Sequence, residues 1–200
     1  MRSTSACSIC AVADTEPQLG RSHLPGSVVR HMPIYHTTSH TPIGPLLLAA
    51  DDAGLRLIHF QAGPRPMAVP DHWVPASELA GGAAEQLEAY FAGELREFHL
   101  TLAPEGTPFQ LAVWEALEEI PYGATVSYGG LAARIGRPGA ARAVGGANAR
   151  NPLPIVRPCH RVVGSRGQLT GFAGGLDIKR ALLELEQRHG RVSPAHRPAP

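Results

Sequence analysis

The chain has 200 residues, 44% of them hydrophobic, with 18 basic and 17 acidic side chains and a formal net charge of +1. That length suits one large domain or two small ones, and the composition allows a sizeable core. No apolar run reaches the roughly 18 residues of a membrane span, and the N-terminus is a poor match to a secretory signal. We therefore expect a cytoplasmic protein.

Residues 1–31 mix serine, proline, histidine and charged residues without periodicity, a composition typical of a disordered leader. Met32 precedes the first patterned segment and is an alternative start. Cys7 and Cys10 form a C-x-x-C pair, but no second pair follows, so we expect no zinc site there. Cys159 brings the total to three, an odd number that fits a reducing compartment better than a disulfide framework.

The first half of the chain predicts a small α/β domain over residues 32–103. Two apolar runs, 45–50 and 55–60, are separated by Asp-Asp-Ala-Gly and predict an antiparallel β-hairpin. A proline-rich loop follows. Ser77 is then a candidate N-cap for a helix that continues toward Leu95.

The second half predicts a mostly helical domain over residues 104–190, so the fold class is α/β (α+β). Thr107 followed by Pro108 favours a helix start. Ser127 is a candidate cap for a short second helix, and a third helix is expected over 140–148. Two short helices joined by a glycine-containing turn are typical of a helix-turn-helix.

The remaining C-terminal elements are shorter or simpler. Prolines exclude a helix from 151 to 158, and 161–163 predict a short strand. Asp177 is a candidate cap for a last amphipathic helix that ends near His189. Residues 191–200 are expected to be a flexible tail.

Charge is unevenly distributed along this balanced chain. The stretch from Ile120 to Leu176 contains no Asp or Glu but carries seven arginines: Arg134, Arg137, Arg142, Arg150, Arg157, Arg161 and Arg166. Such a stretch favours an anionic partner such as DNA, although a solvated basic surface would look the same. The third helix is rich in Ala and Gly, which allows close approach either by another helix or by a DNA backbone.

Cys159 is the candidate nucleophile. Its neighbours Arg157, His160 and Arg161 are cationic, an environment expected to lower the pKa of a thiol and to favour the thiolate. His160 is a candidate general base, with Glu184 or Glu186 to orient it. From the residues alone, two classes stay open: an enzyme acting on nucleic acid through a cysteine nucleophile, and a DNA-binding regulator with a redox-sensing thiol.

Several motifs together resemble the O6-alkylguanine-DNA alkyltransferase family. The sequence Pro-Cys-His-Arg-Val at 158–162 is similar to the active-site signature of that family, and the other similar segments follow in family order: 126–129, 141–146, 151–155 and 171–176. The similarity is strong from about Thr107 to Glu186 and weaker from about Tyr35 to Leu100. It implies DNA repair by stoichiometric, irreversible transfer of an alkyl group to a cysteine, in a single turnover, with no cofactor and no metal.

The resemblance also implies residue roles. Cys159 would accept the alkyl group, His160 would take its proton, and Glu186 would orient His160. Asn151 would brace the active-site turn, and Tyr128 would donate to a base flipped out of the helix. Arg142 would enter the duplex from the minor groove in place of that base. Other positions assigned to substrate or DNA binding are Ala141, Gly145, Arg161, Val162, Phe172, Ala173 and Gly174.

The implied partner is double-stranded DNA that carries O6-alkylguanine, with O4-alkylthymine as a second candidate lesion, and the expected state is a monomer. Three alternatives remain: a relative that binds lesions without transfer, the redox regulator, and a cysteine hydrolase that uses Cys159, His160 and Glu186.

Overall fold

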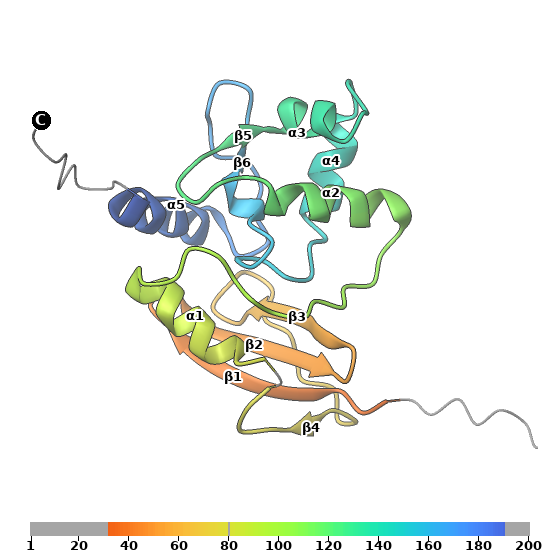
Figure 1. Cartoon of the computed structure of the whole chain (residues 1–200), viewed down its shortest axis with the longest axis vertical. Helices are drawn as coiled ribbons and strands as arrows, with labels where there is room; N and C mark the ends of the chain where they lie inside the picture. Colours follow the sequence, from red (N-terminus) through yellow and green to blue (C-terminus); the bar gives the residue numbers. More distant parts are fainter. Residues whose placement is uncertain (1–31, 80, 191–200) are drawn as a thin grey trace, which may run out of the picture. The chain divides into compact units, whose positions relative to one another are not determined.

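The computed structural model describes residues 32–79 and 81–190, which form an N-terminal sheet domain and a helical C-terminal domain. The expected leader with Cys7 and Cys10, and the expected tail, lie outside the described residues. The first domain contains a sheet in the order β3-β2-β1-β4 and one helix, α1 (Figure 1). The fold class predicted from the sequence is confirmed.

The predicted hairpin is present as β2 (Gly44–Asp51) and β3 (Gly54–Phe60), which pair antiparallel with Asp51 opposite Gly54. The turn works because Gly54 adopts a φ of 134°, and a Cβ there would lie 2.4 Å from the carbonyl oxygen of Thr101. A backbone hydrogen bond of 2.8 Å from Ile58 N to Pro152 O then joins β3 to the C-terminal domain.

Two strands of the N-terminal sheet were not expected from the sequence. β1 (Tyr35–Thr41) pairs antiparallel with β2 along its whole length, and β4 (Val74–Pro75) pairs parallel with β1. β1 has the sequence Tyr-His-Thr-Thr-Ser-His-Thr, which has no apolar run to reveal it. Its strand conformation comes from pairing with the buried β2, so it is a tertiary effect.

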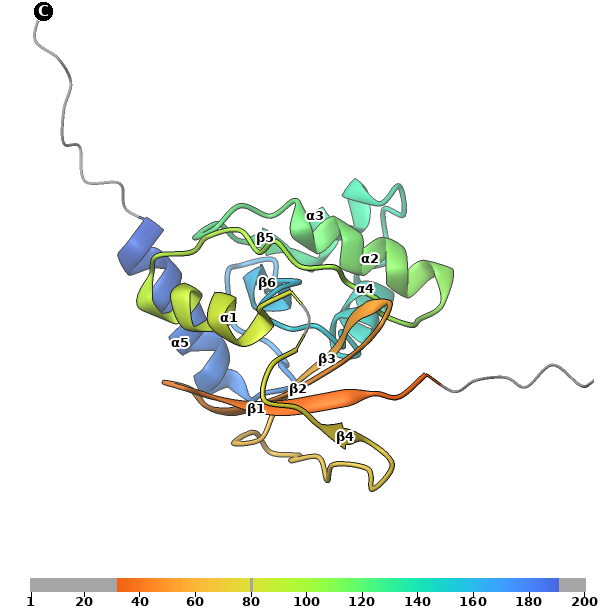
Figure 2. The same ribbon diagram turned by 60° about the horizontal axis from the view of Figure 1, so that its bottom comes forward.

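The helix expected from Ser77 begins later: α1 spans Ala83–Ala92. Gly81 and Gly82 both have positive φ, at 87° and 65°, so the chain cannot be helical there, and Gly82 takes the N-cap position. The apolar side of α1 faces the sheet and α5 (Figure 2), and its buried residues are Ala83, Leu87 and Tyr90.

The C-terminal helices follow the predicted order. α2 (Pro108–Glu118) starts with a capping box between Thr107 and Gln110, and the Ser127 hydroxyl caps α3 (Tyr128–Arg134). α4 (Ala141–Asn148) completes the helix-turn-helix. The Trp114 indole of α2 donates to the carbonyl of Ala147 at 2.9 Å, which ties α2 to the end of α4.

The segment after α4 contains the 3₁₀ turn η1 (Cys159–Arg161), the two-residue strand β6 (Val162–Val163) and the helix α5 (Leu176–Gly190). β6 pairs parallel with β5 (Val126–Ser127). The expected strand over 161–163 therefore starts one residue later, because Arg161 belongs to the 3₁₀ turn. Asp177 does not cap α5 but lies in its first turn, where a negative charge suits the helix dipole.

The described residues form two apolar clusters, one shared by both domains and one within the C-terminal domain. One packs the sheet and α1 against residues of the active-site turn and α5, and the other packs α2, α3 and α4 around Cys159 and Val162. Within residues 32–79 and 81–190, no helix is long and apolar enough to cross a membrane.

Candidate active site

The turn that leads to Cys159 is held by a dense set of hydrogen bonds. The Asn151 amide donates to the Arg157 carbonyl at 2.7 Å, and its oxygen accepts from Leu153 N at 3.0 Å. The backbone adds Arg157 N to Leu153 O at 2.8 Å and Cys159 N to Arg157 O at 2.7 Å. Asn151 therefore bridges both ends of the turn.

This turn stores backbone strain. Ile155 has a φ of 75°, the one positive φ at a non-glycine residue in the described chain, and it is 1% exposed. A β-branched residue in the left-handed region costs on the order of 1–3 kcal/mol and persists only where its surroundings fix it. The Asn151 bonds and burial against the sheet domain supply that constraint, so the position of Cys159 depends on both domains.

Cys159 lies buried in the 3₁₀ turn, 4% exposed. Burial raises the pKa of its thiol to about 11, although hydrogen bonding from Asn151 and the charge of Lys179 act in the opposite direction. The sequence had led us to expect a lowered pKa. That expectation was wrong because desolvation of the buried thiol outweighs the groups that favour the thiolate, and Arg157 and Arg161 are themselves paired with Glu118 and Glu186. The thiolate therefore needs a base.

His160 is fully buried, and its Nε2 lies 2.8 Å from Oε1 of Glu186. Its other nitrogen, Nδ1, is buried without a hydrogen-bond partner among the described residues. Burial lowers the pKa of His160, despite the opposing effect of Glu186, so the ring is neutral at pH 7. A neutral imidazole fixed at one nitrogen and free at the other can accept a proton. Of the two carboxylates left open by the sequence, the one at the ring is Glu186.

Glu186 is the centre of a buried network. Arg161 donates to it from Nε and Nη2 at 2.9 to 3.2 Å, and also donates to the Ile120 carbonyl at 2.5 Å. Gly123 N donates to Oε2 at 2.9 Å, and the Tyr90 hydroxyl donates to Oε1 at 2.8 Å. Burial alone would raise the pKa of Glu186, but His160 and Arg161 lower it to about 2, so the carboxylate stays charged.

Lys179 on α5 was not singled out by sequence reasoning. It is 0% exposed, and its Nζ donates to the carbonyls of Val162 at 2.7 Å and Thr170 at 3.1 Å. The ammonium also lies 5.9 Å from the ring centres of Tyr128 and Phe172. A signal was available, since Lys179 lies three and seven residues before Leu182 and Glu186, on the buried face of the helix. It joins the cysteine turn to the pocket wall.

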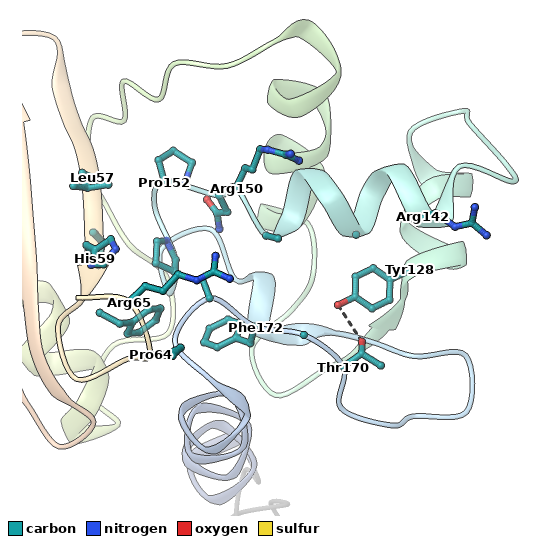
Figure 3. A pocket seen from close by; sticks show the side chains of 18 of the residues that line it. Leu57, His59, Pro64, Arg65, Tyr128, Arg142, Arg150, Pro152, Thr170 and Phe172 are labelled. Carbon is teal, nitrogen blue, oxygen red and sulfur yellow. Dashed lines mark hydrogen bonds between the residues drawn. The ribbon is translucent and has the colours of Figure 1, made fainter. Parts of the chain in front are cut away.

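A pocket of about 950 Å³ opens beside this network (Figure 3). Asn151 is shared between the pocket lining and the cysteine turn, and Tyr128 and Phe172 line the pocket while packing against the cluster that contains Cys159. The volume is in the range of small-molecule sites and would hold a nucleobase. The lining comes from both domains, with Leu57, His59, Pro64 and Arg65 on the sheet side and Ala141, Arg142, Gly145, Thr170 and Ala173 on the other.

Tyr128 is positioned to donate. The Thr170 hydroxyl donates to the Tyr128 oxygen at 3.2 Å, the dashed line in Figure 3. Because that bond uses the phenolic oxygen as an acceptor, the phenolic hydrogen stays available to a ligand. α4 passes the ring closely, since a Cβ at Gly145 would lie 3.7 Å from Tyr128.

The other predicted site residues lie either on the pocket rim or in the buried interior. Arg142 is exposed at the start of α4, on the pocket rim, with Ala141 beside it. Arg161 and Val162 were expected to bind substrate or DNA, but they are buried, Arg161 in the Glu186 network and Val162 in the helical core. Gly174 is also buried, with a Cβ there meeting the Phe60 ring at 2.9 Å.

No three His, Cys, Asp or Glu side chains gather in a group that could hold a metal ion, within the residues that the structure describes.

Two family models match most of the chain. Residues 34–104 match the ribonuclease-like domain of 6-O-methylguanine DNA methyltransferase, and residues 108–188 match its DNA binding domain. The chain is 56% identical over 153 residues to a methylated-DNA–protein-cysteine methyltransferase of Methanosarcina acetivorans, covering 76% of this chain and 98% of that protein. It is 52% identical to the protein of that name from Mycobacterium tuberculosis, covering 77% and 93%.

Solved structures agree. The crystal structure of the Mycobacterium tuberculosis O6-methylguanine methyltransferase matches with a TM-score of 0.73 and 49% identity over 82% of this chain and 96% of that one. A structure of the mycobacterial protein in complex with DNA matches with a TM-score of 0.72, 50% identity and coverage of 78% and 94%. Since the matches span both domains and the cysteine site, the chain belongs to the 6-O-methylguanine DNA methyltransferase family.

Proposed function

We propose that this protein repairs DNA by moving an alkyl group from O6 of guanine to the sulfur of Cys159, once per molecule. The observation that carries the proposal is the buried Cys159–His160–Glu186 set beside a pocket large enough to admit a nucleobase. A methylated-DNA–protein-cysteine methyltransferase activity fits this arrangement, because the site holds one nucleophile and one base.

The proton leaves the thiol first. Since burial holds the pKa of Cys159 near 11, the thiol is protonated at pH 7 and must pass its proton to His160. Nδ1 is the nitrogen that is free to receive it, because Glu186 occupies Nε2. Glu186 then balances the imidazolium charge without becoming protonated, since its own pKa is about 2.

The transfer itself is a displacement at carbon. The thiolate forms a bond to the alkyl carbon, the bond from that carbon to O6 breaks, and its electron pair stays on the guanine. His160 then returns its proton to the guanine anion, so the products are neutral guanine, an S-alkylcysteine and a neutral imidazole. The thioether has no leaving group that this site could activate, so the reaction stops after one turnover.

The pocket would receive the base after it leaves the helical stack, because O6 of a paired guanine is inside the duplex. Tyr128 would donate its free phenolic hydrogen to the base, and Phe172 would contact its face. The exposed Arg142 at the start of α4 would fill the space left in the duplex, approached from the minor groove. The Ala- and Gly-rich surface of α4 has little to read base edges with, which suits a protein that must bind any sequence.

We also infer that the protein acts as a monomer in the cytoplasm on double-stranded DNA, where a free thiol stays reduced. We place the domain boundary between residues 103 and 104, just before the capping box of α2. The relevant lesion is O6-alkylguanine, with O4-alkylthymine as a second substrate.

The deciding experiment is intact-protein mass spectrometry after incubation with a duplex that carries one O6-methylguanine. We expect a gain of one methyl group per molecule, on Cys159. An unmodified duplex and the Cys159→Ser variant are the controls, and neither should produce the gain.

Other outcomes would point to other functions. Tight binding to the lesion without a mass change would indicate a damage sensor. Many turnovers on one molecule would indicate a hydrolase, and reversible oxidation of Cys159 without a lesion preference would indicate a redox regulator.

A further inference from the structure

We propose that Tyr90, a residue of the N-terminal domain, is a positioning residue for alkyl transfer: its hydroxyl holds the Glu186 carboxylate and thereby the His160 ring. The inference rests on the proposed function and adds a role for the sheet domain in it. Nothing in the cysteine motif indicates this residue, since Tyr90 lies 69 positions before Cys159, on the buried side of α1.

The contact is short and fully buried. The Tyr90 hydroxyl donates to Oε1 of Glu186 at 2.8 Å, and both side chains are 0% exposed. That oxygen is the one 2.8 Å from Nε2 of His160, so a single atom joins the sheet domain to the base. The Tyr90 hydroxyl thus contacts the carboxylate of Glu186, and that carboxylate contacts the imidazole of His160.

The other donors to Glu186 come from the C-terminal domain, namely Gly123, His160 and Arg161. Tyr90, on α1, is therefore the donor to this carboxylate that comes from the N-terminal domain. Burial, followed by the charge of Glu186, raises the pKa of Tyr90, so the phenol stays protonated and remains a donor. An ionised tyrosine would instead repel the carboxylate.

Tyr122 provides an internal comparison. Its ring lies 6.0 Å from that of Tyr90, and its hydroxyl is also buried, yet that hydroxyl has no hydrogen-bond partner among the described residues. Both rings belong to one aromatic cluster, so packing alone would make the two hydroxyls equivalent. Only the hydroxyl of Tyr90 reaches Glu186, which separates positioning from packing.

Removing the Tyr90 hydroxyl has two expected consequences. The carboxylate gains freedom to turn, so the base is less often aligned with the thiol. Oε1 also regains negative charge, which strengthens its hold on a proton at His160 and raises the pKa of that ring. Around this pair the remaining charged or titratable groups are Tyr122, Arg161, Lys179 and Cys159, and all stay unchanged in Tyr90→Phe.

The test compares the full-length Tyr90→Phe and Tyr122→Phe variants with the wild type. The single-turnover rate constant for methyl transfer from an O6-methylguanine duplex is measured from pH 5 to 9. We expect Tyr90→Phe to be about tenfold slower at neutral pH, the low end of what a hydrogen bond to a charged group contributes. Its acidic limb should move to higher pH. Tyr122→Phe should match the wild type in rate and in pH profile.

A stability control completes the experiment. Leu87→Val weakens the packing of the same helix without touching Glu186, and Leu87 is 0% exposed. It should lower the urea midpoint but leave the rate unchanged. If Tyr90→Phe has the wild-type rate and pH profile, or if Leu87→Val slows transfer as much, the positioning role is overturned. Wild-type protein that takes up no methyl would instead refute the proposed function.

Discussion

The seven arginines of residues 120–176, the segment without Asp or Glu, fall into two groups, one buried and one exposed. Arg157 and Arg161 are buried, at 7% and 6% exposure, and each pairs with a carboxylate from outside the segment, Glu118 or Glu186. Arg134, Arg137, Arg142, Arg150 and Arg166 are exposed, and none forms an ion pair within the described residues. A charge run in sequence is therefore not one surface.

The difference separates two jobs. Arg161 belongs to the buried hydrogen-bond network of Glu186, and Arg157 is paired with Glu118 at the turn that leads to Cys159. Among the exposed arginines, Arg134 lies on α3, and Arg142 and Arg150 line the pocket, where free positive charge can meet phosphate. Substitutions in the buried group should therefore change the transfer rate or the free energy of unfolding, and substitutions in the exposed group should change action on DNA or DNA affinity.

The largest effect is expected inside the buried network. His160→Ala removes the base, and with a thiol pKa near 11 only about one molecule in 10⁴ would carry a thiolate at pH 7. Methyl transfer at pH 7 should fall about 10²- to 10⁴-fold. It should then recover about tenfold per pH unit as the pH rises toward 11, since the thiol ionises on its own. A single-turnover pH series checks this, and a flat profile would contradict it.

Arg161→Leu should chiefly affect the fold. It leaves the Glu186 carboxylate buried without its main counter-charge, which costs about 3–5 kcal/mol of unfolding free energy. Urea denaturation followed by fluorescence measures the loss. The matched control is Arg166→Leu on the exposed side, expected within about 0.5 kcal/mol of the wild type. If Arg161→Leu and Arg166→Leu lowered the free energy of unfolding equally, the pairing of Arg161 with Glu186 would not stabilise the fold more than an exposed arginine does.

Arg142→Ala should lower activity without lowering stability. If its side chain replaces the flipped nucleotide, transfer from duplex DNA should slow by about 10- to 100-fold, because unpairing one base costs a few kcal/mol and each ~1.4 kcal/mol is a factor of ten. Transfer from free O6-benzylguanine, which needs no flipping, should stay as in the wild type. Equal slowing with both substrates would place Arg142 in the base pocket instead.

Arg137→Ala is expected to have the smallest effect. Removing one phosphate contact should weaken DNA binding equally for all sequences and reduce the slope of log affinity against log salt by about 0.9. Fluorescence anisotropy at several salt concentrations measures the slope. Arg157→Met is the matched control. Because Arg157 is already paired with Glu118, its loss should leave the slope of log affinity against log salt unchanged.

Local chemistry made much of the fold predictable. The hairpin turn, the Thr107–Pro108 helix start and the Ser127 cap each depend on residues within a few positions of one another. Elements that depend on distant partners were missed or misplaced. β1 needs β2 beside it, and α1 starts late because Gly81 and Gly82 take positive φ.

The site divides in the same way. The motif around Cys159 indicated the candidate nucleophile and base, since the cysteine and histidine are adjacent in sequence. The residues alone left Glu184 and Glu186 open as the partner of His160, and only the family resemblance implied Glu186. Tyr90 and Lys179 could not be assigned to the site from their neighbours, because their relevance comes from contacts across domains and along the inner face of α5.

The sequence by itself determined which groups are available: a cysteine with an adjacent imidazole, a helix-turn-helix poor in base-reading side chains, and a segment from 120 to 176 with seven arginines and no acidic residue. The tertiary structure decided what those groups do. Burial raises the pKa of the thiol and makes a base necessary, and folding brings Glu118 and Glu186 to two of the arginines and leaves five exposed. The physical reason is that desolvation and Coulomb pairing depend on distance in space, which the order of residues does not contain.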